Sequence, residues 1–459
     1  MVKELIDYLR DKKIIILGFG REGQSTYKLI RNHLKNQKLV IADGKENFEL
    51  NNDLLKCDKN VECIGGKLYL DGLENYDIIM KSPGISFVGL DISKIENKIK
   101  SQIELFLEFF NVKTIGITGT KGKSTTSSLI YKMLKDQNEK SKFLGNIGIP
   151  VFDFVDEIEE NMTIVLELSS HQLEFVKKSP NIAILLNIFE EHLDHYASYE
   201  KYAEAKCNIY KYQNPEDYFL CNIDNEMIRK CVKTSNSKTI EVSLKNGCTD
   251  EFESNKNINK FAYLYLKDNC VYFNNKLIYD ASKPRALLGE YNLNNIMFVL
   301  GVSEILNLNI EKSIESISSF KTLEHRLEFV GKYDDVFYYD NCIGTIPMAT
   351  IEAVKALNNV NTLIIGGMDR GIDYTDFIEF LNNSDIEHIV CMPKTGHDIA
   401  KFLNGNKAIV VETLEEAVEV SKKVTKKGMS CLISPAAASY GFFKNFEEKG
   451  DKFKALVRA

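Results

Sequence analysis

The sequence KTIGITGTKGKSTT, residues 113–126, decides the fold class. Its apolar first half, 114–118, is short enough for a buried parallel strand. A helical pattern after the turn continues to about residue 134. A strand, a glycine-rich turn and a helix in this order predict a phosphate site, because the backbone N–H groups of the turn and the helix N-terminus attract anions. The turn consists of Gly119, Thr120, Lys121, Gly122, Lys123, Ser124 and Thr125.

The residue types in this turn indicate that it binds a nucleoside triphosphate. Lys123 is placed to contact the β- and γ-phosphates, and the hydroxyl of Ser124 is a ligand for Mg²⁺. The spacing departs from the general P-loop pattern, which has glycine where this chain has Ile117. The alternative is an ordinary glycine-rich turn with an incidental Lys-Ser pair, but the strand before it and the helix after it favour the phosphate site.

A second glycine-rich turn follows an apolar run at 14–17. It contains Gly18, Gly20 and Gly23, and Asp43 ends the next apolar run. This spacing is typical of dinucleotide-binding turns, in which the acid binds ribose. Glycines are also needed for tight packing of a strand against a helix, so the motif supports a nucleotide better than it supports NAD and a redox enzyme. Two such turns favour a kinase or ligase that acts on a nucleotide-bearing substrate.

The 459 residues suggest about three domains. Apolar runs alternate with amphipathic segments, which is typical of parallel α/β layers. Residues 213–285 differ, since short alternating pieces such as 261–265 predict peripheral antiparallel strands. We expect a Rossmann-like domain at 1–102, a central α/β domain at 103–320 and a second Rossmann-like domain at 321–459. Strands are also predicted at 39–42, 78–81, 163–168, 182–187, 336–339, 362–365, 388–391, 409–411 and 429–433, and a helix at 23–33.

The composition limits the classes of partner. The formal net charge of −7 gives no basic footprint for nucleic acid or for an anionic membrane, so the expected partners are small molecules. The 10 cysteines lack the paired spacing of a zinc site, which favours a reducing compartment. No secretory leader or membrane-spanning run is apparent. We expect a cytoplasmic protein.

Acidic and histidine side chains follow two more predicted strands. Glu167 lies at the end of one strand and Ser169 follows it, and Glu191, His192 and His195 come after the next strand. Parallel strands present their carboxyl ends at one edge of a sheet, so these groups are expected to lie together. Such a cluster can bind zinc, but a phosphate-transfer site favours Mg²⁺ with oxygen ligands and an occasional imidazole. A structural or solvent-facing role for His195 is an equal alternative.

These motifs resemble those of the ATP-dependent Mur ligases in order and spacing, over essentially the whole chain. The segments at 18–23, 81–85, 434–439 and 443–446 most resemble the branch of the family that adds D-glutamate. The remaining motifs are 119–125, Gly145-Asn146-Ile147-Gly148, Glu167-Leu168-Ser169-Ser170, Glu191-His192-Leu193-Asp194, Tyr202-Ala203-Glu204-Ala205-Lys206, 289–295 and Glu324-His325-Arg326.

The resemblance implies an ATP-dependent amide ligase of cytoplasmic peptidoglycan precursor synthesis. ATP would convert the carboxylate of UDP-N-acetylmuramoyl-L-alanine to an acyl phosphate, which the amine of D-glutamate would attack. It implies two Mg²⁺ ions and a carbamylated lysine at Lys206, and we expect a monomer. The implied catalytic residues are Lys123, Glu167, His192 and Lys206, and the implied metal ligands are Ser124, Glu167, His192 and the Lys206 carbamate.

The resemblance also implies three sets of binding residues. ATP would contact the turn at 119–125 together with Asn292, Asn295, Arg326 and Asn341. The UDP substrate would contact Gly18, Arg21, Glu22, Asp43, Gly44, Lys45, Ser82, Asn146 and Ser169. The amino acid would contact Thr345, Arg370, Ser439, Tyr440 and Phe446.

The predicted amino-acid site departs from the family pattern. Where the family has Asn-Asp-Ser-Lys-Ala-Thr, this chain has DNCIGT at 340–345, so a lysine becomes Ile343 and an aspartate becomes Asn341 unless Asp340 substitutes for it. A second family lysine aligns with Arg370, which can bind a carboxylate through two hydrogen bonds. Two alternatives therefore stay open: the same reaction with L-glutamate, and a non-catalytic homologue that binds the UDP-sugar peptide.

Overall fold

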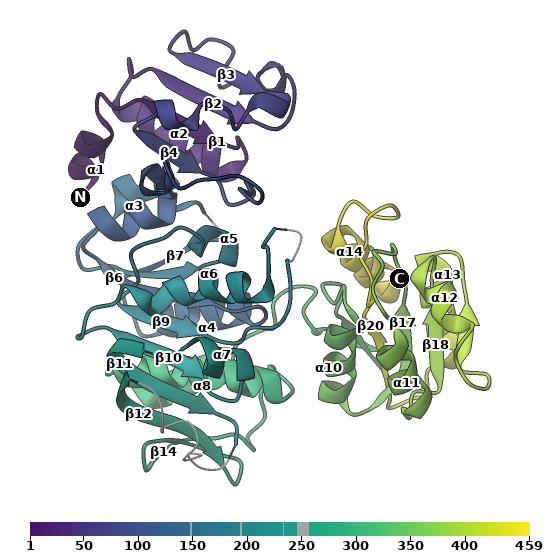
Figure 1. Cartoon of the computed structure of the whole chain (residues 1–459). Coiled ribbons are helices and arrows are strands. Elements are labelled where there is room, and N and C mark those ends of the chain that lie inside the picture. The colour runs from purple at the N-terminus through teal and green to yellow at the C-terminus, as the bar shows by residue number, and fades with distance from the viewer. Residues whose placement is uncertain (147–148, 193–194, 233, 246–256) are drawn as a thin grey trace. The chain divides into compact units, whose positions relative to one another are not determined.

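The computed structural model describes residues 1–146, 149–192, 195–232, 234–245 and 257–459. These residues form three sheets within two compact units (Figure 1). The first unit, Met1–Pro284 with Asn294–Ser318, holds two sheets, and the second, Arg285–Leu293 with Ser319–Ala459, holds one. The sheets follow one another in the order of the three predicted domains. The exact boundaries at 102 and 320 stay predictions.

The first sheet is parallel throughout and has the order β3-β2-β1-β4-β5. Strands β1 and β4 are buried along their whole length, which explains the apolar run of β1 and the three apolar residues that precede Lys81 in β4. The order reverses at β1, and ligands of α/β sheets bind where the strand order reverses. The elements are α1 (Val2–Leu9), β1 (Ile14–Leu17), α2 (Arg21–His33), β2 (Leu39–Asp43), β3 (Val61–Gly65), β4 (Ile78–Lys81), β5 (Ile99–Lys100) and α3 (Gln102–Phe109).

The second sheet has nine strands in the order β14-β13-β12-β11-β10-β9-β6-β8-β7. The predicted strand before the phosphate-binding turn is β6, and it pairs in parallel with β8 and β9. Its elements are β6 (Lys113–Thr118), α4 (Lys123–Asp136), β7 (Ser141–Gly145), β8 (Thr163–Glu167), α5 (Ser170–Leu173), β9 (Ile182–Leu185), α6 (Tyr199–Lys211), β10 (Tyr218–Asn222), α7 (Glu226–Cys231), β11 (Thr234–Ser243), β12 (Asn257–Lys267), β13 (Cys270–Phe273), β14 (Lys276–Asp280) and α9 (Ile310–Ser318). Helix α8 (Glu290–Ile305) begins in the second unit and ends in the first.

The strands predicted to be antiparallel lie at one edge of this sheet (Figure 1). Strand β13 pairs antiparallel with both β12 and β14, as expected. Strand β10, however, pairs in parallel with β9 and β11, and β11 pairs in parallel with β12, so the antiparallel prediction is wrong for these pairs. An alternating pattern predicts one buried face but carries no information on the direction of the neighbouring strand, so the sequence could not decide this pairing.

The third sheet lies in the second unit and has the order β15-β16-β20-β17-β18-β19. Its pairs are parallel except for the hairpin of β15 with β16. The loops after β17 and β20 therefore leave from the same edge. The elements are β15 (Glu328–Tyr333), β16 (Val336–Asp340), α10 (Pro347–Leu357), β17 (Val360–Ile365), α11 (Thr375–Asn383), β18 (His388–Cys391), α12 (Thr395–Ala400), β19 (Ala408–Val410), α13 (Leu414–Val424), β20 (Ser430–Ile433) and α14 (Phe446–Arg458).

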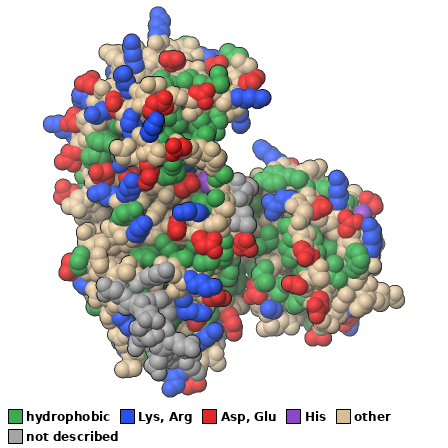
Figure 2. Space-filling model, in the orientation of Figure 1, with side chains coloured by type: hydrophobic (Ala, Val, Ile, Leu, Met, Phe, Trp, Pro, Cys, Tyr) green, Lys and Arg blue, Asp and Glu red, His purple; other side chains and the backbone are tan. Residues whose placement is uncertain are grey.

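The surface carries both signs of charge. Figure 2 shows basic and acidic side chains interspersed over the visible face of each unit. Among the described helices, none combines the length and the apolar character needed to cross a membrane.

One apolar core runs without a break from the first sheet into the second, and it includes Phe106 of α3 and Phe152.

Candidate functional site

The first glycine turn is fixed by hydrogen bonds between three neighbouring strand ends. The carboxylate of Asp43 accepts from the backbone N–H of Phe19 at 2.8 Å and from that of Lys45 at 2.9 Å. The hydroxyl of Ser82 donates to the carbonyl of Gly18 at 2.9 Å. The loops at this edge, the end of β2 and the start of α2 carry residues predicted to bind the UDP substrate: Gly18, Arg21, Glu22, Asp43, Gly44, Lys45 and Ser82.

Glycine is needed where helix α2 meets this turn. A Cβ at Gly23 would collide with the carbonyl oxygen of Gly18, so only glycine lets the helix approach so closely.

Glu22, on the same turn of the helix, accepts a hydrogen bond from Gln172 of α5 at 2.6 Å. Burial raises the pKa of the Glu22 carboxyl, although Gln172 and Lys81 oppose this shift. Its predicted contact with the UDP substrate stays a prediction.

The phosphate-binding turn has the predicted form, since α4 begins at Lys123. Gly122 has φ of +87°, which favours glycine, and a Cβ there would lie 2.5 Å from the Oδ1 of Asn295. This approach places Asn295, a predicted ATP contact on α8, against the turn. The side chain of Asn187, which follows β9, accepts from the backbone N–H of Lys121 at 2.8 Å and so helps to hold the turn in place.

Two lysine ammonium groups meet at one carbonyl of the turn. The Nζ of Lys123 and the Nζ of Lys206 each donate to the carbonyl oxygen of Gly119 at 3.0 Å. Lys206 is 2% exposed. Its burial, with the charge of Lys123 beside it, holds the pKa of Lys206 well below its ordinary value.

The carboxylate of Glu167 lies fully buried at the end of β8. It accepts from the Nδ2 of Asn146 at 3.0 Å and lies 3.4 Å from the hydroxyl of Ser127. Strand β8 neighbours both β6 and β7, so the predicted residues Asn146 and Glu167 do come together. Carboxylate and hydroxyl oxygens are the ligands that Mg²⁺ prefers, so Glu167 and the buried Ser124 suit such an ion.

The loop after β9 carries three differently placed ionisable groups. His192 has φ of +59° and a side chain 46% exposed, and its ring lies 4.8 Å from that of His171. Glu191 forms an ion pair with Lys121 at 2.6 Å. Burial opposes the charge of Glu191, but Lys121 outweighs it and holds the pKa below its ordinary value. His195 is buried beside Glu174, which supports the structural alternative for this residue.

Parts of two family motifs lie outside the described residues, namely Ile147 with Gly148 and Leu193 with Asp194. The predicted substrate contact Ser169 is described: its hydroxyl accepts from the backbone N–H of Gln172 at 3.2 Å and caps helix α5. Thr120 is also described, and its hydroxyl lies 2.9 Å from that of Tyr202.

The second unit holds the other predicted ATP residues. Arg326 follows His325, and Asn292 is 3% exposed on α8, with its Nδ2 donating to the carbonyl of Leu288 at 2.8 Å. The amide of Asn341 accepts from the N–H of Leu327 at 3.2 Å and donates to Ser434 at 2.9 Å. These bonds give Asn341 a structural role, and its contact with ATP stays a prediction.

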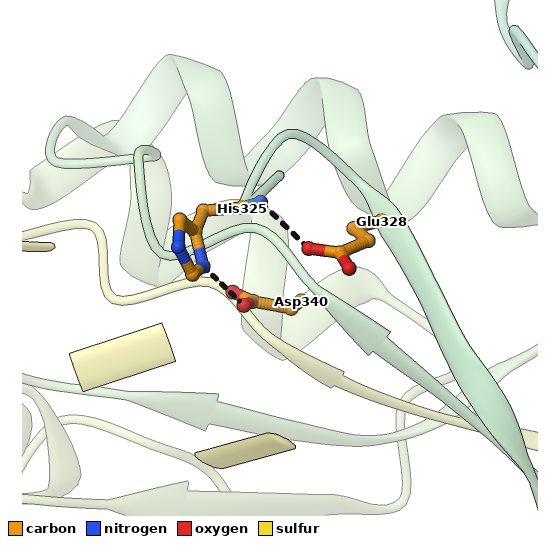
Figure 3. A group of neighbouring side chains, drawn as sticks. All are labelled: His325, Glu328 and Asp340. Carbon is orange, nitrogen blue, oxygen red and sulfur yellow. Dashed lines mark hydrogen bonds and ion pairs between the residues drawn. The ribbon is translucent and has the colours of Figure 1, made fainter. Parts of the chain in front are cut away.

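His325, Glu328 and Asp340 form a group whose ligand atoms lie within 4.8 Å of one another (Figure 3). Hydrogen bonds already join them: His325 Nδ1 is 2.7 Å from Asp340 Oδ2, and the N–H of His325 donates to Glu328 at 2.9 Å. Gly450 packs so closely that a Cβ there would clash with both His325 and Asp340. We interpret the group as a buried His–Asp ion pair and not as a metal centre.

Asp340 itself is fully buried, and its second oxygen accepts from the N–H of Cys342 at 2.9 Å. Whether Asp340 replaces the missing family aspartate stays a prediction.

The His325–Asp340 pair predicts a pH-dependent stability. Burial lowers the pKa of His325, but Asp340 outweighs it, and the net pKa is raised. Because the pKa of His325 is higher in the folded protein than in the unfolded chain, its protonation stabilises the fold at pH values below the unfolded-state pKa. That stabilisation is lost as the pH rises through the folded-state pKa. We expect Asp340→Asn to lower the free energy of unfolding by about 1–2 kcal/mol near pH 6 and by less near pH 9, measured by urea denaturation.

Asp451 provides the control for this prediction. Its carboxylate lies 3.7 Å from the other ring nitrogen of His325 but is 67% exposed, so Asp451→Asn is expected to change stability little. An equal loss for Asp340→Asn at both pH values would contradict the ion-pair interpretation.

The predicted amino-acid residues lie in loops of the second unit, except for Phe446, which begins helix α14. Ser439 is 3% exposed, and its hydroxyl has no hydrogen-bond partner within the described part of the chain. Arg370 and Tyr440 are exposed, whereas Thr345 and Phe446 are half-buried. The ring of Phe446 packs edge-on against that of His325 at 6.0 Å.

The sequence did not predict several residues that support the site, because they belong to no recognisable motif. Asn187 and Ser127 support the turn and Glu167, and Glu174 pairs with both Lys81 and His195. Asn187 carried one usable signal, because it is the last residue of a predicted strand, at the edge where ligands bind. The partners of Glu174 lie far from it in sequence and left no pattern.

Similarity to known proteins shows the family to which this chain belongs. The Mur ligase middle domain matches residues 117–303. A UDP-N-acetylmuramoylalanine--D-glutamate ligase of Clostridioides difficile is 32% identical over 98% of this chain and 99% of its own length. A ligase of the same name from Clostridium kluyveri is 33% identical over 98% of this chain and 97% of its own. The chain belongs to the Mur ligase family.

Solved structures of other Mur ligases share the fold of this one. A MurF ligase from Thermotoga maritima in complex with ADP has a TM-score of 0.59 at 16% identity, covering 99% of this chain and 96% of its own. A MurC from the same organism has a TM-score of 0.58 at 18% identity, covering 97% and 99%. These matches confirm the predicted α/β fold class of this Mur ligase.

Proposed function

We propose that this Mur ligase adds D-glutamate to UDP-N-acetylmuramoyl-L-alanine at the expense of ATP, in cytoplasmic peptidoglycan precursor synthesis. The observation that carries the substrate assignment is the full-length similarity to ligases named for this reaction. The phosphate-binding turn with two converging lysines supports the energy source.

The chemistry needs ATP because joining a carboxylate to an amine is uphill in water. The substrate carboxylate attacks the γ-phosphorus of ATP, which releases ADP and leaves an acyl phosphate. The amine of glutamate then attacks the acyl carbon, and the C–O bond to phosphate breaks. The amine loses a proton, so the products are the amide, ADP and inorganic phosphate.

The chain's own residues supply positioning and positive charge for these steps. Lys123 would hold the β- and γ-phosphates over the turn, and the N–H groups from Gly119 to Thr125 would surround them. Asn295 and Asn292 would hold the adenosine, together with Arg326 and Asn341. Asn146 and Ser169 would contact the substrate near its reacting carboxylate.

Magnesium fits the donor groups next to the turn. Ser124, Glu167, His192 and a carbamate on Lys206 would hold it, and bound Mg²⁺ neutralises negative charge on the phosphoryl group. The lowered pKa of Lys206 favours the neutral amine that adds carbon dioxide, and the resulting carbamate replaces a cation with an anion.

Residues at the loops of the third sheet would select the amino acid. The buried hydroxyl of Ser439 can donate to a carboxylate, and Arg370 can bind a carboxylate through two hydrogen bonds. Thr345, Tyr440 and Phe446 would complete the pocket. The remaining partners in this proposal are small molecules, and the protein acts as a monomer.

Phosphate release with each glutamate enantiomer tests the assignment. With ATP, Mg²⁺ and UDP-N-acetylmuramoyl-L-alanine, we expect D-glutamate to be used at least about a hundredfold better than L-glutamate, with no release when the UDP substrate is omitted. Turnover with L-glutamate and none with the D-enantiomer would overturn the D-glutamate assignment. Binding of the UDP substrate without phosphate release from any amino acid would show a non-catalytic homologue.

A further inference from the structure

A lysine is buried directly beside the first substrate turn. Lys81 ends β4 and precedes Ser82, and its side chain is only 3% exposed. Its ammonium lies 5.5 Å from the ring centre of Phe175 and 6.0 Å from that of Phe87. Neither this charge nor its burial is explained by the contacts proposed for the substrate.

Glu174 connects Lys81 to the loop that carries His192. One oxygen of Glu174 lies 3.1 Å from the ammonium of Lys81 and 3.1 Å from the Nε2 of His195. The carboxylate is 17% exposed, and the His195 side chain is 8% exposed. We call Lys81, Glu174 and His195 the Lys81 link.

Aromatic contacts fix the far end of the link. The ring of His195 lies 4.2 Å from that of His171, which in turn lies 4.8 Å from that of His192. The backbone carbonyl of His195 also accepts from the hydroxyl of Ser86 at 3.4 Å, so a loop of the first sheet contacts the same segment.

The energetic cost of burying charge indicates that the ion pair of Lys81 and Glu174 positions its two loops more than it stabilises the fold. Removing an ammonium and a carboxylate from water is costly, and their attraction often does no more than offset that cost. A methionine at position 81 would fill the same space without the cost. The charges instead impose one geometry, because breaking the pair leaves a buried ion without its partner.

We propose that the Lys81 link is a set of positioning residues that fixes the spacing between the loop of Ser82, which would hold the UDP end of the substrate, and the loop of His192, which would hold magnesium near the reacting carboxylate. This inference rests on the proposed function, in which Ser82 contacts the UDP end and His192 binds magnesium at the other end of the same substrate. The hydrogen bond from Gln172 to Glu22 forms a second connection between the same two sheets.

Binding measurements separate this role from a purely structural one. We expect Lys81→Met to weaken binding of UDP-N-acetylmuramoyl-L-alanine about tenfold, because that ligand spans both loops. Binding of UDP alone and of an ATP analogue should change less than about twofold, because each contacts one end only. Isothermal titration calorimetry with Mg²⁺ present measures all three dissociation constants.

Matched variants sharpen the experiment. Lys177→Met removes an exposed ion pair with Glu96, 3.4 Å across the same two parts of the chain, and should leave all three constants unchanged. Lys81→Arg keeps the charge and should recover most of the affinity. His195→Phe keeps a ring but loses the contact to Glu174. The double variant Lys81→Met with His195→Phe should bind UDP-N-acetylmuramoyl-L-alanine no more weakly than the single variant with the lower affinity.

The outcomes separate the inference from the proposed function. If Lys81→Met weakens the binding of UDP and of the full substrate equally, or weakens the binding of neither, the positioning role is overturned. If Lys81→Met does not fold, judged by thermal unfolding, His195→Phe carries the same test. These constants need no catalysis, whereas a wild-type protein that releases no phosphate would contradict the proposed function alone.

Discussion

Replacing Lys123 by alanine is expected to lower kcat for ATP-dependent ligation by about a thousandfold or more. The Nζ of Lys123 lies over the turn, 3.0 Å from the carbonyl oxygens of Gly119 and Thr120. Without it, the charge that develops on the transferring phosphoryl group loses its nearest fixed cation. Phosphate release under saturating substrates measures the effect.

Lys132 is the matched control for this variant. It lies on the same helix, α4, and pairs at the surface with Asp136 at 2.6 Å, so Lys132→Ala should leave kcat within about twofold of the wild type. A Lys123→Ala protein that folds and retains full activity would exclude the proposed role of the turn.

Replacing Lys206 by alanine is expected to lower kcat by about a hundredfold or more, since the variant can carry no carbamate to bind the metal. The wild-type rate should also fall when carbon dioxide is stripped from the buffer and should recover when bicarbonate is added. Carbon-13 NMR with labelled bicarbonate should show a carbamate signal that the variant lacks.

Lys201, on the same helix α6, controls for the loss of a lysine. It is exposed and pairs with Glu204 at 2.8 Å, so Lys201→Ala should change neither the rate nor the carbamate signal. An active Lys206→Ala protein whose rate ignores bicarbonate would refute a required carbamate.

Local signals in the sequence sufficed for the strands and turns that build the site. Apolar runs predicted β1 and the first three residues of β4, because strands buried on both faces favour apolar side chains. The position directly before the glycine-rich turn predicted β6. Glycines at 18 and 122 marked turns with positive φ. The predicted neighbours Asn146 and Glu167 meet because parallel strands end at the same edge.

Contacts between distant segments could not be predicted in this way. Lys81 and Glu174 are joined only because two sheets pack together, and each residue alone resembles an ordinary surface charge. The partner of Asp340 was equally hidden, since a buried histidine and a nucleotide are both plausible partners for a carboxylate. The parallel pairing of β11 with β12 depends on chain direction, which alternation of side chains does not encode.

The fate of the substrate oxygen tests the central claim most directly. UDP-N-acetylmuramoyl-L-alanine labelled with oxygen-18 in its carboxylate is incubated with ATP, Mg²⁺ and D-glutamate, and the released phosphate is analysed by mass spectrometry. Activation of the carboxylate by ATP predicts one labelled oxygen in each phosphate and one D-glutamyl amide formed with it. Unlabelled phosphate, or phosphate released without the amide, would contradict the account.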